Sequence, residues 1–220
     1  MADGRTARVA VTDRADGDLA VGGDPAVLAE RRRALVDLPW TWLRQVHGDR
    51  VVVVGAPGAG AGEEADAAVT AVTGAVLAVH TADCGPIGLV ADGGAVAVAH
   101  AGWKGLAEGV VERSADALRA VADGPVRAVV GTHIGVECYE FGSEELSGLV
   151  ARLGPEVEGR TASGTPALDL GAGLRVVLAR AGVDEVLEVG GCTACGSGRW
   201  SHRARGDRGR QAVLAGVEAA

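Results

Sequence analysis

Three short apolar segments near the middle of the chain restrict most strongly what this sequence can fold into. They cover residues 75–80, 87–90 and 95–99, and they are bounded by TADCGP, ADGG and AGWKG, which contain turn-forming residues. Apolar runs of about four to eight residues between such turn signals are typical of buried β-strands, whereas amphipathic helices need longer periodic segments. The sequence therefore predicts a group of strands here, with Cys84 and His100 at strand ends.

Helical patterns lie on both sides of these strands. An N-cap aspartate and a first-turn proline at 24–25 begin a helix that extends towards residue 38. Apolar residues at helical spacing predict a single helix over 106–121, which the Gly-Pro pair at 124–125 ends. Further helices are expected within 144–153, over 172–181 and from Arg210 towards the C terminus.

Additional strands are predicted over residues 8–12, 40–46, 50–54, 126–131 and 186–189. The segments 40–46 and 50–54 flank a short His-Gly-Asp connection, which places His47 at a turn between two strands. Hairpin-like strand pairs mixed with helices, without strict alternation, favour a layered α+β fold over a doubly wound sheet. We find no internal repeat and no linker, so we expect one domain over residues 1–220.

Composition excludes several classes of protein. The chain has 220 residues, 48% of them apolar and 23% charged, which is typical of a folded domain rather than a disordered one. Its formal net charge of −8 argues against a nucleic-acid-binding surface. No window approaches the ~20 apolar residues of a membrane-spanning helix, and the charged N-terminal segment does not resemble a secretory signal. We therefore expect a cytoplasmic protein that binds neither nucleic acid nor membranes.

Histidine and cysteine side chains follow three of the predicted strands. His47 lies in RQVHG, Cys84 in HTADCGP and His100 in AHAGWKG. Imidazole and thiolate are ligands that Zn²⁺ prefers, and three protein ligands leave a fourth position open, as in catalytic zinc sites. Spacing alone is weak evidence, because a buried cysteine is often only a small apolar residue. A metal site and an ordinary core thiol therefore both remain open at this point.

Several longer segments carry a family resemblance. They are RQVHGDRV, EADAAVT, TADCGP, AHAGWKGLAEGVVE, IGVECYEFG, LDL, a CT pair and SHRARGDRGRQA. Together, from about residue 40 to the C terminus and in this order, they resemble the YfiH-type family, also called laccase-domain or peptidoglycan-editing-factor proteins. The resemblance implies a single domain of layered mixed β-sheets flanked by helices.

The resemblance also implies an activity and a cofactor. It implies a zinc ion bound by His47, Cys84 and His100. It further implies phosphorolysis of adenosine, inosine, guanosine and methylthioadenosine, with adenosine deamination at the same site. Copper-dependent polyphenol oxidase is an older name within this family. We favour zinc over copper, because a multicopper site needs many clustered histidines and this chain has five. The expected partners are thus purine nucleosides and inorganic phosphate, and we expect a monomer.

Phosphorolysis requires cations that hold phosphate, together with groups that bind the nucleoside. Arg44 and Lys104 flank the proposed zinc ligands and are the catalytic candidates for phosphate, with Arg203 as a further cation. Lys104 is the only lysine, which suits a required compact ammonium but also fits an arginine-biased composition. Arg44 and Arg203 have an ordinary alternative as exposed surface residues.

The remaining candidates are less specific. Asp83 beside the proposed cysteine ligand is a third catalytic candidate, as a ligand-orienting group or proton acceptor, although aspartates also stabilise turns. Gln45, His80 and Trp103 are candidates for substrate binding, and Trp103 suits either purine stacking or packing against the core. His133 and His202 receive no secure role.

The sequence departs from the family pattern in two segments and contains a CxxC. Val136 and Glu137 replace a proline and the first of two cysteines, and the segment after Trp200 lacks a regular arginine and aspartate. The Cys192–Cys195 pair has the spacing of thioredoxin-like motifs, but it lacks a βαβ context and has no second CxxC with which to form a Cys₄ zinc site. We therefore assign it no role from sequence.

Two alternative functions remain open from the sequence. Without a metal, Cys84 would be a nucleophile and His100 its base, in a cysteine hydrolase that acts on peptidoglycan precursors. A non-catalytic module that regulates cell-wall synthesis or division is the other alternative, and it predicts binding without turnover.

Overall fold

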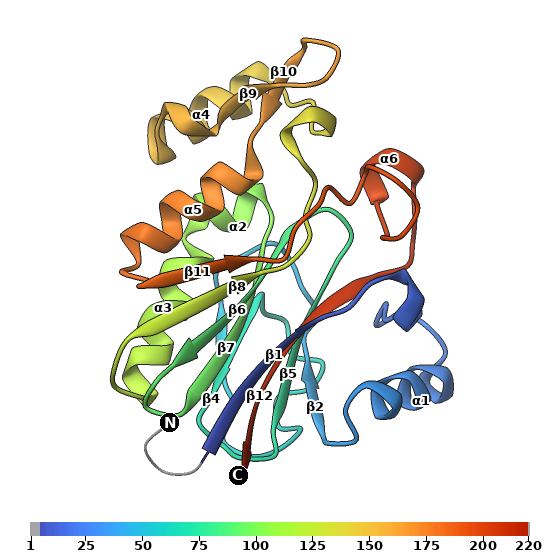
Figure 1. Cartoon of the computed structure of the whole chain (residues 1–220), viewed down its shortest axis with the longest axis vertical. Coiled ribbons are helices and arrows are strands. Elements are labelled where there is room, and N and C mark those ends of the chain that lie inside the picture. Colours follow the sequence, from blue (N-terminus) through green and yellow to red (C-terminus); the bar gives the residue numbers. More distant parts are fainter. Residues whose placement is uncertain (1–4, 220) are drawn as a thin grey trace.

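Ten of the twelve strands in residues 5–219 form two mixed β-sheets that pack face to face (Figure 1). The structure is a computed structural model and describes residues 5–219. The six-stranded sheet has the spatial order β11 (Glu185–Glu188), β8 (Val126–Val130), β6 (Gly85–Ala91), β7 (Ala95–Ala101), β4 (Ala67–Thr70) and β3 (Val51–Val53). The four-stranded sheet has the order β1 (Arg5–Val11), β12 (Gln211–Ala219), β5 (Val76–Thr81) and β2 (Trp40–Trp42). Each sheet contains both parallel and antiparallel neighbours.

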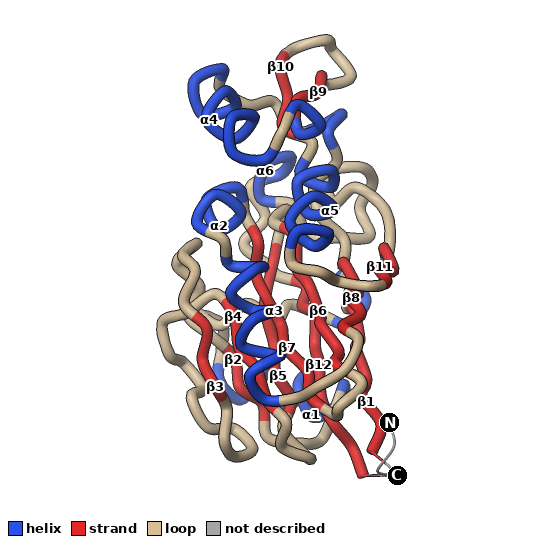
Figure 2. Tube along the Cα trace, turned by 90° about the vertical axis from the view of Figure 1, so that its left-hand side faces the viewer, coloured by secondary structure: helices blue, strands red, loops and turns tan. Residues whose placement is uncertain are grey.

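Helices cover the outer faces of the sheets, as Figures 1 and 2 show. The six-stranded sheet is covered by α2 (Trp103–Glu108), α3 (Val110–Val121) and α5 (Leu170–Arg180), whereas α4 (Ser143–Leu153) packs against α5 beyond the end of the sheet. The short pair β9 (Glu158–Arg160) and β10 (Pro166–Leu168) lies beside α4, while α1 (Pro25–Leu35) lies beside the four-stranded sheet. Short 3-10 turns occupy Arg14–Asp16, Val136–Cys138 and Pro155–Val157, and α6 (His202–Arg205) precedes β12. The predicted layered α+β fold with mixed sheets is confirmed.

Small apolar side chains fill the space between the two sheets. Val79 of β5 and Val98 of β7 are completely buried there. Strands with both faces covered need apolar residues at successive positions, which explains why the central segments are continuous rather than alternating. The sheets approach closely at Gly88, because a Cβ at this position would lie 2.6 Å from Cγ1 of Val9.

The predicted C-terminal helix is wrong. Residues Gln211–Ala219 form strand β12, which pairs antiparallel with β1 on one side and β5 on the other. Alanine-rich segments favour helix in isolation, but helix propensity is worth less than 1 kcal/mol per residue for ordinary residues. Pairing along both edges, together with burial of Val213 between the sheets and Leu214 on the outer face, outweighs that preference.

Two other expectations also need correction. The segments 40–46 and 50–54 do not pair, because β2 joins the four-stranded sheet and β3 the six-stranded sheet. The helix expected over 106–121 is divided, since α2 ends and α3 begins at Gly109, whose φ of 92° interrupts helical geometry. The strand expected over 40–46 is limited to Trp40–Trp42, and the helix that begins at Pro25 ends at Leu35; the remaining predicted helices and strands are observed with small shifts at their ends.

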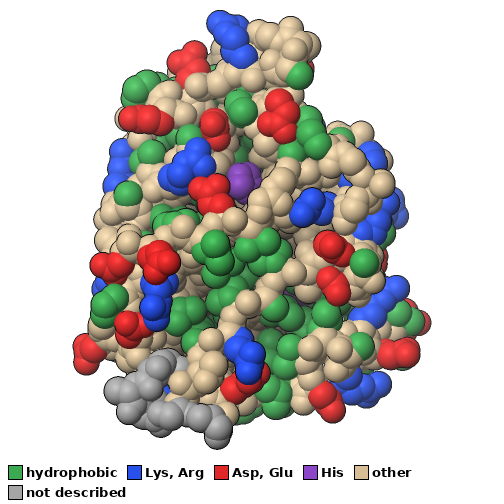
Figure 3. Space-filling view, in the orientation of Figure 1, with side chains coloured by type: hydrophobic (Ala, Val, Ile, Leu, Met, Phe, Trp, Pro, Cys, Tyr) green, Lys and Arg blue, Asp and Glu red, His purple; other side chains and the backbone are tan. Residues whose placement is uncertain are grey.

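The surface carries charges of both signs. On the face shown in Figure 3, basic and acidic side chains are interspersed. Exposed ion pairs include Arg8 with Glu218, at 2.7 Å, and Arg175 with Glu188, at 3.0 Å. Within residues 5–219, no helix combines the length and hydropathy needed to cross a bilayer.

Candidate functional site

A cavity of about 960 Å³ opens beside the ends of β2, β5 and β7. Its walls come from the loop after β2, the β5–β6 and β7–α2 connections, and the segment from α6 to β12. This volume lies in the range of cavities that bind small molecules. All ten candidates from the sequence line it: Arg44, Gln45, His47, His80, Asp83, Cys84, His100, Trp103, Lys104 and Arg203.

The three proposed metal ligands meet at this cavity. The ligand atoms of His47, Cys84 and His100 all lie within 4.8 Å of one another. Sγ of Cys84 is 3.8 Å from Nε2 of His47, and the two imidazole rings meet edge to face with centroids 4.8 Å apart. Gly102 allows this approach, because a Cβ there would lie 2.9 Å from the Cys84 sulfur and 3.0 Å from Cδ2 of His47.

Asp66 holds two of these ligands, and the sequence analysis assigned it no role. Its completely buried carboxylate accepts hydrogen bonds from the backbone N–H groups of Val46, His47 and Gly48, at 2.9–3.0 Å. The same carboxylate lies 2.8 Å from Nδ1 of His100, which leaves Nε2 of that ring free to bind a metal. The only sequence signal at this position is that Asp66 lies within EADAAVT, one of the segments that carry the family resemblance.

The charge distribution in the site favours a thiolate. Burial alone would raise the pKa of the Cys84 thiol, but the charge of His100 and hydrogen bonds from His100 and His47 lower it to about 6. Burial alone would lower the pKa of His100, but the Cys84 thiolate and Asp66 raise it to about 9. Each group therefore stabilises the charged form of the other, and the thiol is readily deprotonated.

Like Arg208, which also lines the cavity and is exposed, Lys104 is a cation available to an anionic ligand. It is exposed at the cavity, its Nζ lies 5.4 Å from the centre of the Trp103 ring, and no carboxylate of residues 5–219 forms an ion pair with it. Arg44, in contrast, is paired with Glu64 at 2.8 Å. Arg203 donates to the carbonyl of Glu140 at 3.0 Å.

Asp83 connects two segments of the cavity wall. It is buried and has a φ of 102°, which is unusual for a residue with a side chain. One carboxylate oxygen accepts from the Thr193 hydroxyl and the other from the backbone N–H of Arg203, both at 2.6 Å. Both oxygens are thus engaged by the protein, and these contacts tie the Cys84 loop to α6. They favour an orienting role over proton transfer.

Gln45 and His80 lie side by side but have different surroundings. The Gln45 amide donates to the backbone C=O of His80 and accepts from its N–H, both at 2.8 Å, which joins the loop after β2 to β5. The His80 side chain is 5% exposed, and neither ring nitrogen has a hydrogen-bond partner within the described structure. Burial lowers the pKa of His80 to about 3, with further lowering by the charges of Arg32, His100 and Arg210. The ring is therefore neutral at physiological pH.

Aromatic side chains form part of the cavity wall. Trp103 packs edge to face against Phe141, with ring centroids 5.6 Å apart, and still lines the cavity. Tyr139 also lines it, beneath the Arg203 guanidinium at 5.0 Å, although the sequence analysis gave it no role. Burial and the nearby negative charge of Cys84 raise the pKa of Tyr139 to about 12, so its phenol remains a hydrogen-bond donor.

His133 and His202, which received no secure role from the sequence, lie at different cavities. His202 lines the same cavity from α6. His133 lies instead beside a smaller cavity of about 210 Å³, which Glu137 and Cys192 also line. Its Nδ1 is 3.2 Å from the carbonyl of Gly131.

The donor set at the main cavity fits a zinc ion. Tetrahedral zinc with bonds of about 2.0–2.3 Å to nitrogen and sulfur requires ligand atoms roughly 3.3–3.8 Å apart, so small side-chain rotations suffice. The low thiol pKa and the Asp66–His100 contact supply the deprotonated sulfur and oriented imidazole that such a site needs. Two histidines and one cysteine also leave one coordination position for a ligand.

Relatives of the chain carry a common name. A purine nucleoside phosphorylase of Streptomyces coelicolor is 41% identical over 204 residues, covering 88% of this chain and 84% of that protein. A purine nucleoside phosphorylase of Xylella fastidiosa is 39% identical over 235 residues, covering 99% of this chain and 90% of that protein.

Solved structures and a family profile agree with this relationship. A Neisseria meningitidis protein superposes with a TM-score of 0.84 at 30% identity, covering 96% of this chain and 94% of that one. YfiH of Bacillus licheniformis has the same fold, with a TM-score of 0.82 at 24% identity and coverage of 96% and 92%. The profile described as multi-copper polyphenol oxidoreductase laccase matches residues 7–218. The chain therefore belongs to this laccase-like family of YfiH-type proteins, as its sequence motifs predicted.

Proposed function

We propose that this protein is a zinc-dependent purine nucleoside phosphorylase. Its substrates would be adenosine, inosine, guanosine and methylthioadenosine, and adenosine deamination would occur at the same site. The observation that carries the proposal is the single cavity in which an unpaired lysine, an aromatic wall and the His47–Cys84–His100 cluster lie together. The names of the relatives support the phosphorolysis of purine nucleosides within this proposal.

Different residues of the cavity wall would bind the nucleoside and the phosphate. Trp103 and Tyr139 supply aromatic surface for a purine and its ribose, and the protonated Tyr139 hydroxyl supplies a donor. Lys104 supplies a charge-assisted hydrogen bond to phosphate, with Arg44 and Arg203 as further cations. In phosphorolysis a phosphate oxygen bonds to C1′ as the C1′–N9 bond breaks, and the purine leaves after gaining a proton. The residues of the cavity would hold these two reactants in contact.

The cluster at the end of the cavity would hold zinc. When bound, zinc would supply a Lewis acid, which would stabilise negative charge that develops during phosphorolysis and would also suit hydrolytic removal of ammonia from adenosine. Two imidazoles and one thiolate match zinc, and among the described residues no further histidine joins His47 and His100 to build a multicopper cluster. The residues of this chain contribute orientation: Asp66 sets the His100 ring, and Gln45 and Asp83 hold the two loops that carry His47 and Cys84.

The central experiment compares nucleoside turnover with and without inorganic phosphate. We expect free base and ribose 1-phosphate to form only when phosphate is present, resolved by chromatography. Base release that is unaffected by phosphate would identify a nucleosidase instead, and inosine formation alone would identify a deaminase. Absence of any turnover by zinc-loaded protein would favour the cysteine hydrolase or the non-catalytic module.

A Lys104→Met variant is expected to need at least about tenfold more phosphate for half-maximal rate. Loss of one charge-assisted hydrogen bond costs roughly 1.5–3 kcal/mol. Methionine keeps the unbranched aliphatic part of the side chain beside Trp103, so packing is conserved. Initial rates at varied phosphate measure the effect, and zinc content should stay unchanged. An unaltered phosphate dependence would show that other cations bind the anion.

An Asp66→Asn variant is expected to bind zinc about 10–100-fold more weakly, the usual cost of losing a group that orients a metal-bound histidine. Asparagine keeps the shape of the side chain but has one acceptor oxygen in place of the carboxylate. Competition with a chelator of known affinity measures the change. Wild-type affinity in this variant would mean that the backbone alone positions His47 and His100.

A further inference from the structure

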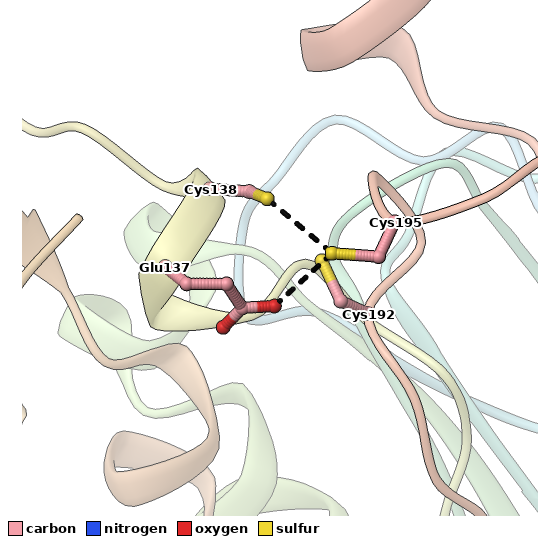
Figure 4. Close-up of side chains that lie close together, drawn as sticks. All are labelled: Glu137, Cys138, Cys192 and Cys195. Atoms are coloured by element: carbon pink, nitrogen blue, oxygen red, sulfur yellow. Dashed lines mark hydrogen bonds between the residues drawn. The ribbon is translucent and has the colours of Figure 1, made fainter. Parts of the chain in front are cut away.

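A second cluster of metal-binding side chains lies outside the active-site cavity. Glu137 and Cys138 come from the 3-10 turn Val136–Cys138, whereas Cys192 and Cys195 come from the loop after β11. These segments are distant in sequence, yet Figure 4 shows their side chains pointing towards one another. The four potential ligand atoms all lie within 4.8 Å of each other.

The spacing of these atoms resembles the edges of a metal tetrahedron. Sγ of Cys138 and Sγ of Cys195 are 3.6 Å apart, and Sγ of Cys195 is 3.4 Å from Oε1 of Glu137. A tetrahedral zinc ion with bonds of about 2.3 Å to sulfur separates two sulfur ligands by about 3.8 Å. Three sulfurs and one carboxylate oxygen would complete four-coordination without a water ligand, as in structural rather than catalytic zinc sites.

Without a metal this cluster favours protonated thiols, because hydrogen bonds with Cys138, Cys192 and Glu137 raise the pKa of Cys195 to about 12, so zinc would displace thiol protons as it binds. The backbone N–H of Gly135 donates to Sγ of Cys192 at 3.1 Å. The guanidinium of Arg205 donates to the carbonyls of Thr193, Ala194 and Gly196 and is paired with Asp207 at 3.0 Å, so it orders the loop that carries both cysteines of the CxxC. A zinc ion with three thiolates and a carboxylate would have a formal charge of −2, and the Gly135 N–H would donate to one of these sulfurs.

A redox role fits the same residues less well. Thioredoxin-like cysteines owe their low thiol pKa to the N-terminus of a helix, but residues 192–199 form no helix here. The third cysteine and the glutamate also have no function in a two-cysteine disulfide. They are, however, needed for a four-ligand site.

We propose that Glu137, Cys138, Cys192 and Cys195 bind a second, structural zinc ion. This site is independent of the proposed catalytic function. Cys138 directly precedes Tyr139, which lines the active-site cavity, and Cys192 precedes Thr193, whose hydroxyl holds Asp83 at 2.6 Å. The ion would therefore fasten together two segments that shape one wall of that cavity.

Zinc content in ligand variants tests the proposal without any activity measurement. Protein purified under reducing conditions and loaded with zinc alone should hold two equivalents after gel filtration. The His47→Ala, Cys84→Ala, His100→Ala variant should retain one. The Cys138→Ser, Cys195→Ser variant should also retain one, and the combination of both sets should retain none. Circular dichroism checks that each variant is folded.

Cobalt absorbance and chelator competition distinguish the two metal sites. Sulfur-to-cobalt charge-transfer absorbance should persist for the most part in a Cys84→Ser variant, because three of four thiolate ligands belong to the second site. It should fall strongly in the Cys138→Ser, Cys195→Ser variant. A Glu137→Gln variant should bind the second zinc more weakly than wild type in a chelator competition.

Several results would overturn the proposal. One is a single zinc equivalent that disappears in the His47, Cys84 and His100 variant. Another is a disulfide among Cys138, Cys192 and Cys195 in protein that was purified with reductant and zinc, detected as a loss of two mass units by intact mass spectrometry. Retention of two equivalents in the Cys138→Ser, Cys195→Ser variant would likewise place the second ion elsewhere.

Discussion

A His47→Ala variant is expected to lose the zinc of the His47–Cys84–His100 site and at least about a hundredfold in kcat/KM for phosphorolysis. Removal of one of three protein ligands weakens metal binding strongly, and a metal Lewis acid contributes several kcal/mol to transition-state stabilisation. His47 is the best position for this test because it is exposed, so alanine leaves no cavity in the core. Metal analysis and initial rates with inosine and phosphate measure the two effects.

His133→Ala is the matched control for this experiment. It removes the same chemical group from a residue that lies beside the smaller cavity rather than at the proposed active site. Glu137 and Cys192 of the second proposed zinc site line the same small cavity, so the control is compared at the first site only: the zinc bound by His47, Cys84 and His100 and the rate of phosphorolysis should both stay close to wild type. Full zinc content and full turnover in His47→Ala would contradict the ligand assignment. Full zinc content with lost turnover would instead assign His47 a role other than metal binding.

In a His80→Leu variant, the free energy of unfolding is expected to fall less at acidic pH than it does in the wild type. The pKa of His80 is about 3 in the folded protein against 6.5 when unperturbed, so between these values the unfolded chain binds one more proton. Stability that depends on neutral His80 is therefore present above pH 6.5 and lost as pH falls towards 3. From pH 7.5 to 4.5, this one group should lower the free energy of unfolding by about 2–3 kcal/mol in the wild type.

The measurement is the difference in unfolding free energy between wild type and variant at each pH. Both proteins are compared with chelator present, so that metal loss at low pH does not contribute. We expect the difference to change by about 2–3 kcal/mol in favour of His80→Leu as pH falls from 7.5 to 4.5. His202→Leu is the control, since His202 is exposed and its removal should leave the pH dependence unchanged. Parallel pH profiles for wild type and His80→Leu would show that His80 does not resist protonation.

Local signals predicted most of the elements, and their failures have a common cause. Continuous apolar runs identified β5, β6 and β7, and capping residues identified α1. Alanine-rich Gln211–Ala219 was misassigned because its state depends on pairing with β1 and β5, neither of which is a near neighbour in sequence. Strand formation in this segment is a property of the sheet rather than of the segment.

The same distinction between local sequence signals and long-range contacts applies to the candidate site. The residue types at His47, Cys84 and His100 predicted metal chemistry, because imidazole and thiolate at strand ends carry that chemistry wherever they meet. The roles of Asp66 and Tyr139 could not be predicted, since a buried carboxylate or phenol has a role only through its contacts. The availability of Lys104 and the occupied oxygens of Asp83 likewise became visible only through their surroundings.

The sequence by itself determined the layered α+β character, the family and the chemical types of the site residues, because periodicity, turn residues and ligand chemistry are local properties. Tertiary structure alone decided that Cys138 meets the CxxC pair, that Asp66 joins His100, and that β12 lies inside a sheet. The physical reason is that these outcomes depend on distances between segments far apart in the chain. Those distances are set by the packing of two sheets around a shared core, which no single segment encodes.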